Sequence, residues 1–128
     1  MAGLAFLTVI SSSLVAMATA APAGPAAYSG SMTYNPYNGN LGACGRPINN
    51  GDSTVAVAPK FFTAGNPGND PICGRTVTIT YNGKSATAQV WDKCPGCGDN
   101  DLDATPDLFT RMVGSLDPGR VNVQWTGI

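Results

Sequence analysis

The sequence predicts a mainly β protein, a compact barrel with one or two short helices. Short alternating runs of apolar and polar residues recur from residue 29 onward and are broken by Gly, Asn and Pro. One segment has the spacing and the end signals of a helix, and the chain contains no internal repeat. With 128 residues, the chain is long enough for one such domain.

The first 20 residues are typical of an export signal. Two apolar runs precede Ala18-Thr19-Ala20, a small-x-small pattern that signal peptidases accept. A membrane anchor is the alternative, but three serines interrupt a stretch already short for crossing a bilayer. We therefore expect a secreted, extracellular protein with a signal peptide at 1–20, a flexible lead-in at 21–28 and the barrel domain at 29–128.

Five strands can be placed directly from the alternation, over 31–34, 54–58, 76–81, 85–91 and 120–125. A loop dense in turn-forming residues follows the first of them. The third and fourth strands form the clearest unit, because Asn82-Gly83 separates them. Both residues accept positive φ, so we predict a hairpin with a tight type I′ turn.

The predicted helix begins after Thr105, which can cap it. Pro106 suits the first helical position, and Asp107 complements the positive end of the helix dipole. Gly114 ends the helix. The apolar residues that share one helix face are Leu108, Phe109, Met112 and Val113.

Composition and charge exclude several classes of function. The net charge is −1 and the seven basic residues are scattered, so the chain has no electrostatic footprint for nucleic acid or an anionic membrane. The absence of histidine excludes His-based triads, His general bases and most zinc sites. An Asp-rich run at 99–103 begins like a calcium loop but lacks the glycine and glutamate of an EF-hand. We expect an uncharged partner and neither metal nor cofactor.

Four cysteines, Cys44, Cys73, Cys94 and Cys97, are consistent with two disulfides formed in an oxidising compartment. Four cysteines allow three pairings, and their spacing does not choose among them. Cys94 and Cys97 have the spacing of a redox motif, but Gly98-Asp99-Asn100 follows where a redox site has a helix. We therefore interpret this pair of residues as structural.

Four segments, taken in order, resemble the double-psi β-barrel family of expansins, barwin and rare lipoprotein A. They are Thr33-Tyr34, Gly42-Ala43-Cys44-Gly45, Cys73-Gly74, and the run Val90–Cys97 leading into Leu102–Phe109. The resemblance is closest to the stand-alone fungal expansin-like proteins called loosenins. It implies a six-stranded double-psi β-barrel with an open groove, and disulfides that join Cys44 to Cys73 and Cys94 to Cys97.

The resemblance also implies that polysaccharide lies in the groove over Asp103, Asp92 and Thr33. Inverting hydrolysis needs one carboxyl group as acid and another as base, on opposite sides of the bond. Related barrel endoglucanases carry the base soon after the first strand, and here no carboxylate lies near Asn35. Asp103 is thus expected to be an acid or key polar residue without its base. Asp92 is expected on the same side of the bond, either as a ligand contact or as a buried hydrogen-bonding strut.

The aromatic residues divide into candidate binding residues and candidate core residues. Tyr34 and Tyr37 lie beside the Gly/Asn-rich loop and are candidates for exposed platforms that stack on sugar rings. Trp91 faces either the groove or a secondary core. The aromatic residues expected to pack in the interior are Phe61, Phe62, Phe109 and Trp125.

These observations predict a monomeric protein that binds and loosens cellulose, xyloglucan or chitin without hydrolysing it. One alternative is a lytic transglycosylase-like or weak endoglucanase activity with Asp103 as the acid, because a hydroxyl of the substrate can replace water. A second alternative is a barwin-like defence or protease-inhibitor protein that binds another protein. The sequence does not choose among the three polysaccharides.

Overall fold

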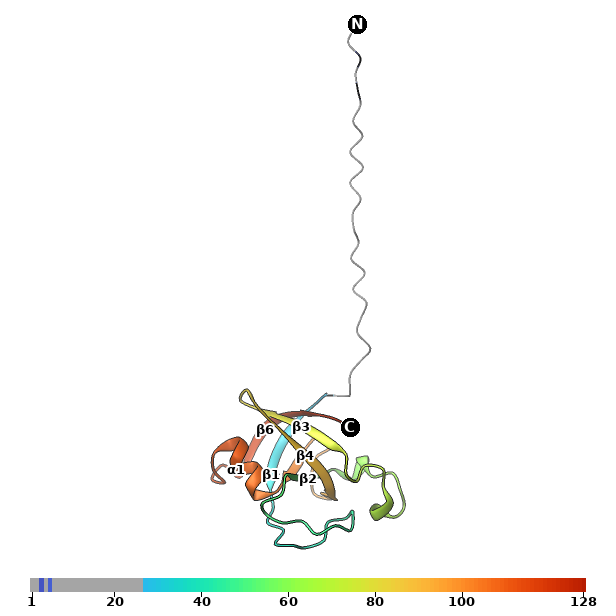
Figure 1. The fold of residues 1–128 in the computed structure, drawn as a ribbon, viewed down its shortest axis with the longest axis vertical. Helices are drawn as coiled ribbons and strands as arrows, with labels where there is room; N and C mark the ends of the chain where they lie inside the picture. Colours follow the sequence, from blue (N-terminus) through green and yellow to red (C-terminus); the bar gives the residue numbers. More distant parts are fainter. Residues whose placement is uncertain (1–2, 4, 6–26) are drawn as a thin grey trace.

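Six strands close into a barrel with the neighbour order β1-β5-β2-β4-β3-β6 in this computed structural model (Figure 1). The structure describes residues 3, 5 and 27–128, so the predicted signal peptide at 1–20 and most of the lead-in at 21–28 lie outside the described residues. The strands are β1 (Ala27–Tyr34), β2 (Thr54–Val57), β3 (Thr76–Tyr81), β4 (Lys84–Lys93), β5 (Leu102–Ala104) and β6 (Arg120–Thr126). The predicted mainly β barrel is confirmed.

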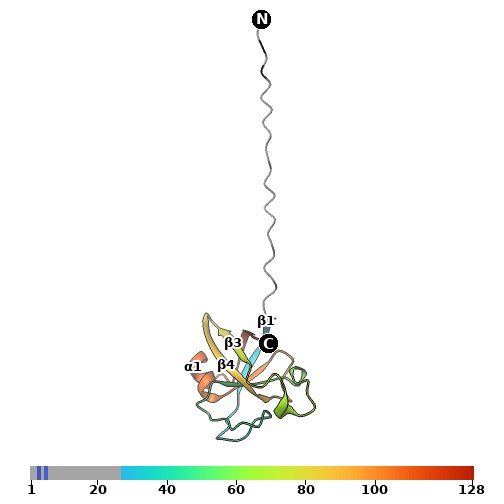
Figure 2. The same ribbon diagram turned by 45° about the vertical axis from the view of Figure 1, so that its right-hand side comes forward.

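Strand pairing mixes parallel and antiparallel neighbours. β1 pairs with β5 and β2 with β4 in parallel, whereas β1 with β6, β2 with β5 and β3 with both its neighbours are antiparallel. Parallel pairing requires long connections between partners. The long segment between β1 and β2 lies at the end of the barrel away from the β3–β4 turn, as Figures 1 and 2 show.

The β3–β4 hairpin has the predicted turn. Asn82 and Gly83 both adopt positive φ, 45° and 78°, which is the backbone that a type I′ turn requires. Val77 and Ile79 are fully buried, while the threonines that alternate with them on β3 are exposed. The hairpin therefore contributes one apolar face to the core and one uncharged polar face to the surface.

The core fills the barrel interior and extends under the helix α1 (Pro106–Val113). Its largest fully buried side chains are Trp125, Phe109, Met32, Ile48, Ile79, Leu102 and Leu108. Phe109 and Trp125 are buried as predicted, and Phe61 and Phe62 pack against the core while partly exposed. None of the helices in the described part of the chain is long and apolar enough to cross a membrane.

Three local predictions need correction. β5 was not recognised, because a three-residue strand is too short to show alternation. β1 begins at Ala27, so the last two residues of the predicted lead-in belong to the barrel. Thr105 occupies the N-cap position of α1, but its hydroxyl donates to the carbonyl of Asp52 and caps no helix N–H. Gly114 ends the helix in the left-handed conformation, as predicted.

Two disulfides fasten the loops to the barrel. Cys44 is bonded to Cys73, with 5.8 Å between their Cα atoms, and Cys94 is bonded to Cys97. This is the pairing that the resemblance implied. Two short 3-10 turns, Pro59–Phe61 and Pro67–Asn69, lie in the segment before Cys73. Cys44 thus ties the β1–β2 loop to the β2–β3 loop.

Candidate functional site

Four positions from four strands lie side by side on the barrel. Thr33 of β1 pairs with Asp103 of β5, Asp103 pairs with Ala56 of β2, and Ala56 pairs with Asp92 of β4. Met32 precedes Thr33 on β1, and Leu102 and Ala104 flank Asp103 on β5; all three are fully buried. Alternation therefore directs the side chains of Thr33 and Asp103 outward. Residues about 70 positions apart in sequence are therefore brought together by register alone.

A β-bulge puts Asp92 in this row. The β2–β4 register pairs Val55 with Val90 and Ala56 with Asp92, which leaves Trp91 as an extra residue on β4. Uninterrupted alternation would direct Asp92 inward with Val90, whereas the extra residue shifts it to the outer face. No feature of the sequence identifies Trp91 as the bulged residue.

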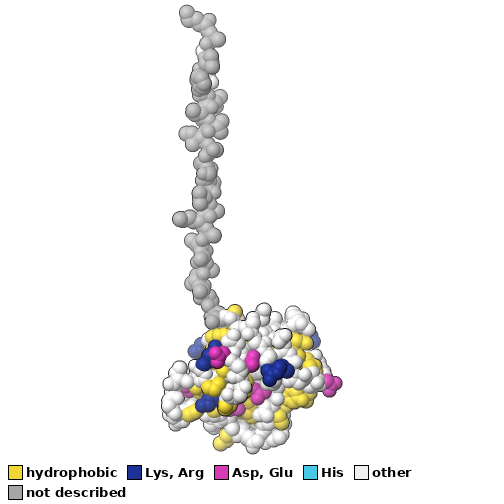
Figure 3. Space-filling view, turned by 180° about the vertical axis from the view of Figure 1, so that it is seen from behind, with side chains coloured by type: hydrophobic (Ala, Val, Ile, Leu, Met, Phe, Trp, Pro, Cys, Tyr) yellow, Lys and Arg dark blue, Asp and Glu magenta, His cyan; other side chains and the backbone are white. Residues whose placement is uncertain are grey.

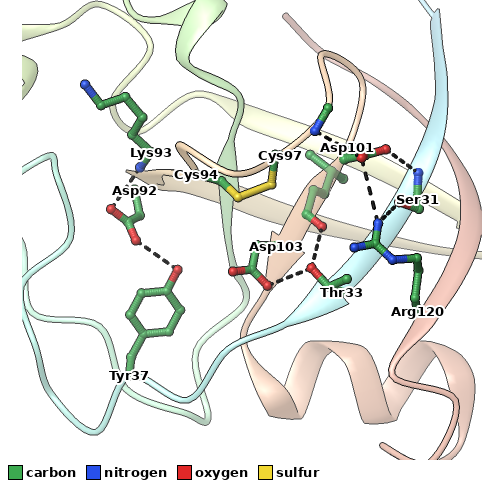
Figure 4. Close-up of a disulfide and its surroundings, with 12 residues drawn as sticks. Ser31, Thr33, Tyr37, Asp92, Lys93, Cys94, Cys97, Asp101, Asp103 and Arg120 are labelled. Atoms are coloured by element: carbon green, nitrogen blue, oxygen red, sulfur yellow. Dashed lines mark hydrogen bonds and ion pairs between the residues drawn. A yellow bond between two sulfur atoms is a disulfide. The ribbon is translucent and has the colours of Figure 1, made fainter.

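Asp103 makes a single side-chain hydrogen bond. The hydroxyl Oγ1 of Thr33 donates to Asp103 Oδ1 at 2.9 Å (Figure 4). Burial raises the pKa of the Asp103 carboxyl, the hydrogen bond from Thr33 lowers it, and the negative charge of Asp92 raises it again. Among the described residues no hydrogen bond reaches Oδ2, so half of this carboxyl group is available to a ligand.

Asp92 is held by three hydrogen bonds. Its Oδ1 accepts from the backbone N–H of Ala43 at 2.8 Å and of Lys93 at 2.8 Å, and its Oδ2 accepts from the hydroxyl of Tyr37 at 3.0 Å. Figure 4 shows the Tyr37 hydroxyl directed at Asp92, beside Asp103. Of the two predicted roles, the geometry gives Asp92 that of a strut, which anchors the β1–β2 loop to the barrel.

The prediction that Tyr37 is an exposed stacking platform is wrong. Its side chain is only 4% exposed, because the β1–β2 loop folds back over the barrel and places the hydroxyl on Asp92. Burial, followed by the negative charge of Asp92, raises the pKa of Tyr37. Tyr34 is half-buried, and its ring packs against Phe109 with 5.1 Å between the ring centroids. Only part of the Tyr34 ring is therefore left for a ligand.

Trp91 lies on the outer surface and outside the main core. The guanidinium of Arg46 lies 4.6 Å from the centroid of its ring, and Gly74 packs closely against the ring. Trp91, Arg46 and Gln89, which accepts a hydrogen bond from the indole N–H, border a surface hollow of about 320 Å³. The row formed by Thr33, Asp103 and Asp92 does not border that hollow.

Within residues 27–128, no group of three or more His, Cys, Asp or Glu side chains is placed to hold a metal ion. On the face that Figure 3 shows, basic and acidic side chains are interspersed. This face therefore has no extended patch of positive or of negative charge.

No protein-family model matches the chain. Among characterised proteins, the papain inhibitor of Streptomyces mobaraensis is 39% identical over 99 residues, which cover 75% of this chain and 68% of that protein. The Allergen Asp f 7 homolog of Arthroderma benhamiae is 44% identical over 85 residues, which cover 66% of this chain and 28% of that protein. The chain thus spans less than a third of the length of this second relative.

Solved structures share the barrel. The Streptomyces papain inhibitor superposes with a TM-score of 0.73 and 36% identity, over 79% of this chain and 93% of that one. The expansin of Clavibacter michiganensis in complex with cellohexaose superposes with a TM-score of 0.67 and 19% identity, over 80% of this chain and 50% of that one. The fungal elicitor cerato-platanin superposes with a TM-score of 0.57 and 22% identity, over 77% of this chain and 91% of that one. The last two likenesses concern the fold alone. They confirm the predicted double-psi barrel and the expansin-like fold, while the finer likeness to loosenins stays a prediction.

Proposed function

The chain belongs to the family of the Streptomyces papain inhibitor, and its barrel is also that of expansins. We propose that it is a secreted protein that binds and loosens neutral polysaccharide without hydrolysing it. The observation that carries the proposal is the pairing of Thr33 with Asp103 on the outer face of β1 and β5. The Thr33 oxygen and the second carboxylate oxygen of Asp103 can both accept hydrogen bonds from sugar hydroxyls, and hydrogen bonds to a carboxylate are strong ones.

The surroundings of Asp103 argue against inverting hydrolysis. That reaction needs a second carboxyl group to activate water on the far side of the sugar ring. Both oxygens of Asp92 are already occupied by protein donors, and Asn35, near the expected base position, is an exposed amide. Loosening needs no covalent step, because the hydrogen bonds between polysaccharide chains are each worth only about 1 kcal/mol net in water.

A lytic activity is the enzymatic alternative at the same residues. In that reaction Asp103 would protonate the glycosidic oxygen as the bond breaks, and a hydroxyl of the same sugar would bond to the anomeric carbon in place of water. The Asp103 carboxylate left by the first proton transfer would take up the proton of that hydroxyl. The raised pKa of the Asp103 carboxyl favours such an acid. The experiment below distinguishes this alternative, because lysis releases fragments and loosening does not.

The test combines binding and cleavage in the same tubes. Cellulose, chitin and xyloglucan-coated cellulose are incubated with the parent, with Asp103→Asn and with Thr110→Ala, an exposed helix control. We expect the parent and the control to bind and to lower the mechanical strength of the substrate. Neither should release soluble fragments, with reducing ends or with anhydro ends, between about pH 3 and about pH 8. Asp103→Asn should loosen less while remaining folded. Steady release of fragments that Asp103→Asn abolishes would replace loosening with lysis, and no binding to any substrate would refute the proposal.

A protein partner is the second candidate function, and one surface feature favours it. Leu41 is 68% exposed and is the only exposed large hydrophobic side chain among the described residues. It lies on a loop made rigid by its bridge to Pro47, by the Ala43–Asp92 hydrogen bond and by the Cys44–Cys73 disulfide. A rigid loop with an apolar tip is suited to enter the cleft of a cysteine protease such as papain, because little entropy is lost when it binds.

Papain inhibition tests this candidate directly. We expect the parent to slow papain hydrolysis of a peptide substrate and Leu41→Asp to raise the inhibition constant about tenfold or more, as is common for a central apolar contact. Asp103→Asn, which leaves Leu41 and the contacts of its loop unchanged, should inhibit like the parent. If the parent does not inhibit at any accessible concentration, the protease-inhibitor function is excluded.

A further inference from the structure

A large hollow lies on the outer surface of β1, β6 and β3, beside the β3–β4 turn. Its volume is about 810 Å³, which is large enough for several sugar units. The side chains that line it from the three strands are Ser29, Ser31, Asn122, Gln124, Thr80 and Tyr81. Neither Thr33 nor Asp103 borders it, so it is not part of the site described above.

The hollow is separated from Thr33 by the side chain of Arg120. Arg120 pairs with Thr33 across β1 and β6, and its guanidinium donates to the hydroxyl of Ser31. In Figure 4, Ser31, Asp101 and Arg120 lie on one side of Thr33, and Asp92 with Tyr37 lies on the other. The two surfaces are therefore neighbours on one barrel with a charged side chain between them.

Strand register arranges the lining in rows. Ser31 pairs with Asn122, Ser29 pairs with Gln124, and Gln124 pairs in turn with Thr80. Neighbouring strands are about 4.8 Å apart, and residues on one face repeat about every 6.7 Å along a strand. The result is a grid of hydroxyl and amide groups, each able to donate and to accept hydrogen bonds.

The hollow carries almost no uncompensated charge. Its one carboxylate, Asp101, accepts from the backbone N–H of Ser31 at 2.8 Å and of Gly98 at 3.1 Å, and lies 3.8 Å from the guanidinium of Arg120. The backbone hydrogen bond from Ser31 is the main cause of the lowered pKa of Asp101. A charged ligand finds no opposite free charge here, whereas a neutral ligand rich in hydroxyl groups finds many partners.

The hollow also offers an apolar ring and a continuation. Tyr81 is half-buried and packs partly against the core, so its ring is held in place before a ligand arrives. Aromatic rings stack on the apolar faces of sugars. A second hollow, of about 230 Å³, shares Ser29, Thr80 and Gln124 with the first and extends it toward Thr126. The second hollow is also lined by Tyr28 and Trp125, so the two form a continuous track of polar and aromatic side chains across three strands.

We propose that this track is a second saccharide-binding site, for a neutral oligosaccharide, distinct from the surface of Thr33 and Asp103. The inference goes beyond the proposed function and does not depend on it, because the two surfaces share no lining residue. A peptide that binds by adding a strand needs an open sheet edge, and this barrel is closed. The closed sheet and the neutral grid therefore favour sugar over peptide.

The test is a titration of the ¹⁵N-labelled secreted protein with cellohexaose and with the chitin hexamer, followed by NMR. We expect the amide signals of Ser29, Ser31, Asn122 and Gln124 to shift with at least one sugar. The double variant Asn122→Ala/Gln124→Ala should raise the Kd of this response about tenfold, since it removes two amide side chains. Asn69→Ala, which changes an exposed asparagine of the β2–β3 loop outside both hollows, is the matched control and should titrate like the parent.

Signals near Thr33 and Asp103 are followed in the same spectra, so the two sites are scored separately. Shifts confined to the track support the inference even if the proposed function fails. The inference is overturned if neither sugar moves the track signals, if the double variant keeps the parent Kd, or if an uncharged peptide of similar length shifts the same signals as strongly. Spectral dispersion reports whether each variant is folded.

Discussion

Asp92 on β4 and Asp103 on β5 are the same residue type on either side of β2, and their surroundings give them different chemistry. Three protein donors engage both oxygens of Asp92, whereas Thr33 alone donates to Asp103. A carboxylate bonded at both oxygens stabilises the loop that reaches it, while one with an oxygen left unbonded can bind a ligand. The division of roles is set by the bulge at Trp91 and by the return of Tyr37, not by the local sequence around either aspartate.

Tyr37→Phe tests the strut. The change removes the hydroxyl that donates to Asp92 and keeps the ring, so we expect a loss of about 2 kcal/mol in the free energy of unfolding, the usual value for a hydrogen bond to a charged group. Urea denaturation measures it. Tyr34→Phe is the matched control, because no hydrogen bond of its hydroxyl is seen in the described residues, and should change stability by less than about 0.5 kcal/mol. Equal effects of the two changes would contradict the strut.

Asp103 should make stability depend on pH. Its folded-state pKa is raised above the ordinary 3.8, chiefly by burial, so the folded protein binds this proton more tightly than the unfolded chain. The stabilising contribution is therefore complete below pH 3.8 and is lost as the pH rises through the folded-state pKa. Asp103→Asn does not titrate. The Tm of the parent, relative to this variant, should fall between acidic and neutral pH, and a constant difference would show that the carboxyl is not perturbed.

The convergence of Thr33 and Asp103 was implied by the family resemblance, and their side chains are hydrogen-bonded. Periodicity alone does not predict it, because the register of β5 against β1 is tertiary information. Sequence reasoning failed for Tyr37, because the exposure of a loop side chain depends on where the loop folds back, and no periodic pattern encodes that path. For Trp91, the bulge was invisible because an extra residue leaves the composition of a strand unchanged.

At the level of elements, the packing of β1 against the turn before β5 depends on the close contact between Gly30 and the backbone of Asn100. A Cβ atom on Gly30 would lie 2.1 Å from the carbonyl oxygen of Asn100, and that same oxygen accepts a hydrogen bond from the indole of Trp125 at 2.8 Å. The turn is thus held from two directions. Only glycine fits at this point of β1 without moving either neighbour.

Gly30→Ala should therefore destabilise the barrel by about 1–3 kcal/mol, the usual cost of overpacking. Gly51→Ala is the control, because no atom lies within 4 Å of its added Cβ. Urea midpoints of the two variants give the comparison. If Gly30→Ala unfolds at the parent midpoint, the approach of β1 to Asn100 is looser than the structure indicates.

The two disulfides should contribute unequally. Cys44–Cys73 joins residues 29 positions apart, and Cys94–Cys97 joins residues 3 apart. Because loop closure restricts the unfolded chain more in a longer loop, replacing the first pair with alanines should cost about 3–4 kcal/mol and replacing the second about 2 kcal/mol. Thermal or urea unfolding of the two double variants measures the difference. A larger loss from the Cys94–Cys97 pair would contradict the chain-entropy account.

Elements with clear boundaries were predictable and short ones were not. Asn82-Gly83 identified the hairpin, and Pro106 with Gly114 marked the two ends of α1. β5 escaped detection because Leu102–Ala104 forms a strand only through its neighbours β1 and β2. Its existence depends on pairing across the barrel, which is tertiary information. The six-stranded count came from the family resemblance and not from the alternation.

At the scale of the whole molecule, the candidate site depends on the closed barrel. Thr33, Asp92 and Asp103 belong to three different strands, and their row also passes through Ala56 on a fourth. No single hairpin or loop contains two of these side chains. Loss of strand pairing at any point of this row separates the side chains of Thr33, Asp92 and Asp103. Polysaccharide binding should therefore be lost together with the global fold and not in a separate local unfolding step.

The pairing of the first and last strands has a consequence for chain connectivity. Ala27, the first residue of β1, lies opposite Thr126, the last residue of β6. These two residues are therefore separated by about one strand spacing, roughly 5 Å. A short Gly/Ser linker from Ile128 to Ala27, with a new opening at the exposed Gly65-Asn66 in the β2–β3 loop, leaves all six strands intact. We expect this circular permutant to unfold cooperatively and to keep the Thr33–Asp103 hydrogen bond. A permutant that does not fold would mean that the order of strand synthesis matters; one that folds would show that the barrel is specified by which strands pair and not by the order in which the chain reaches them.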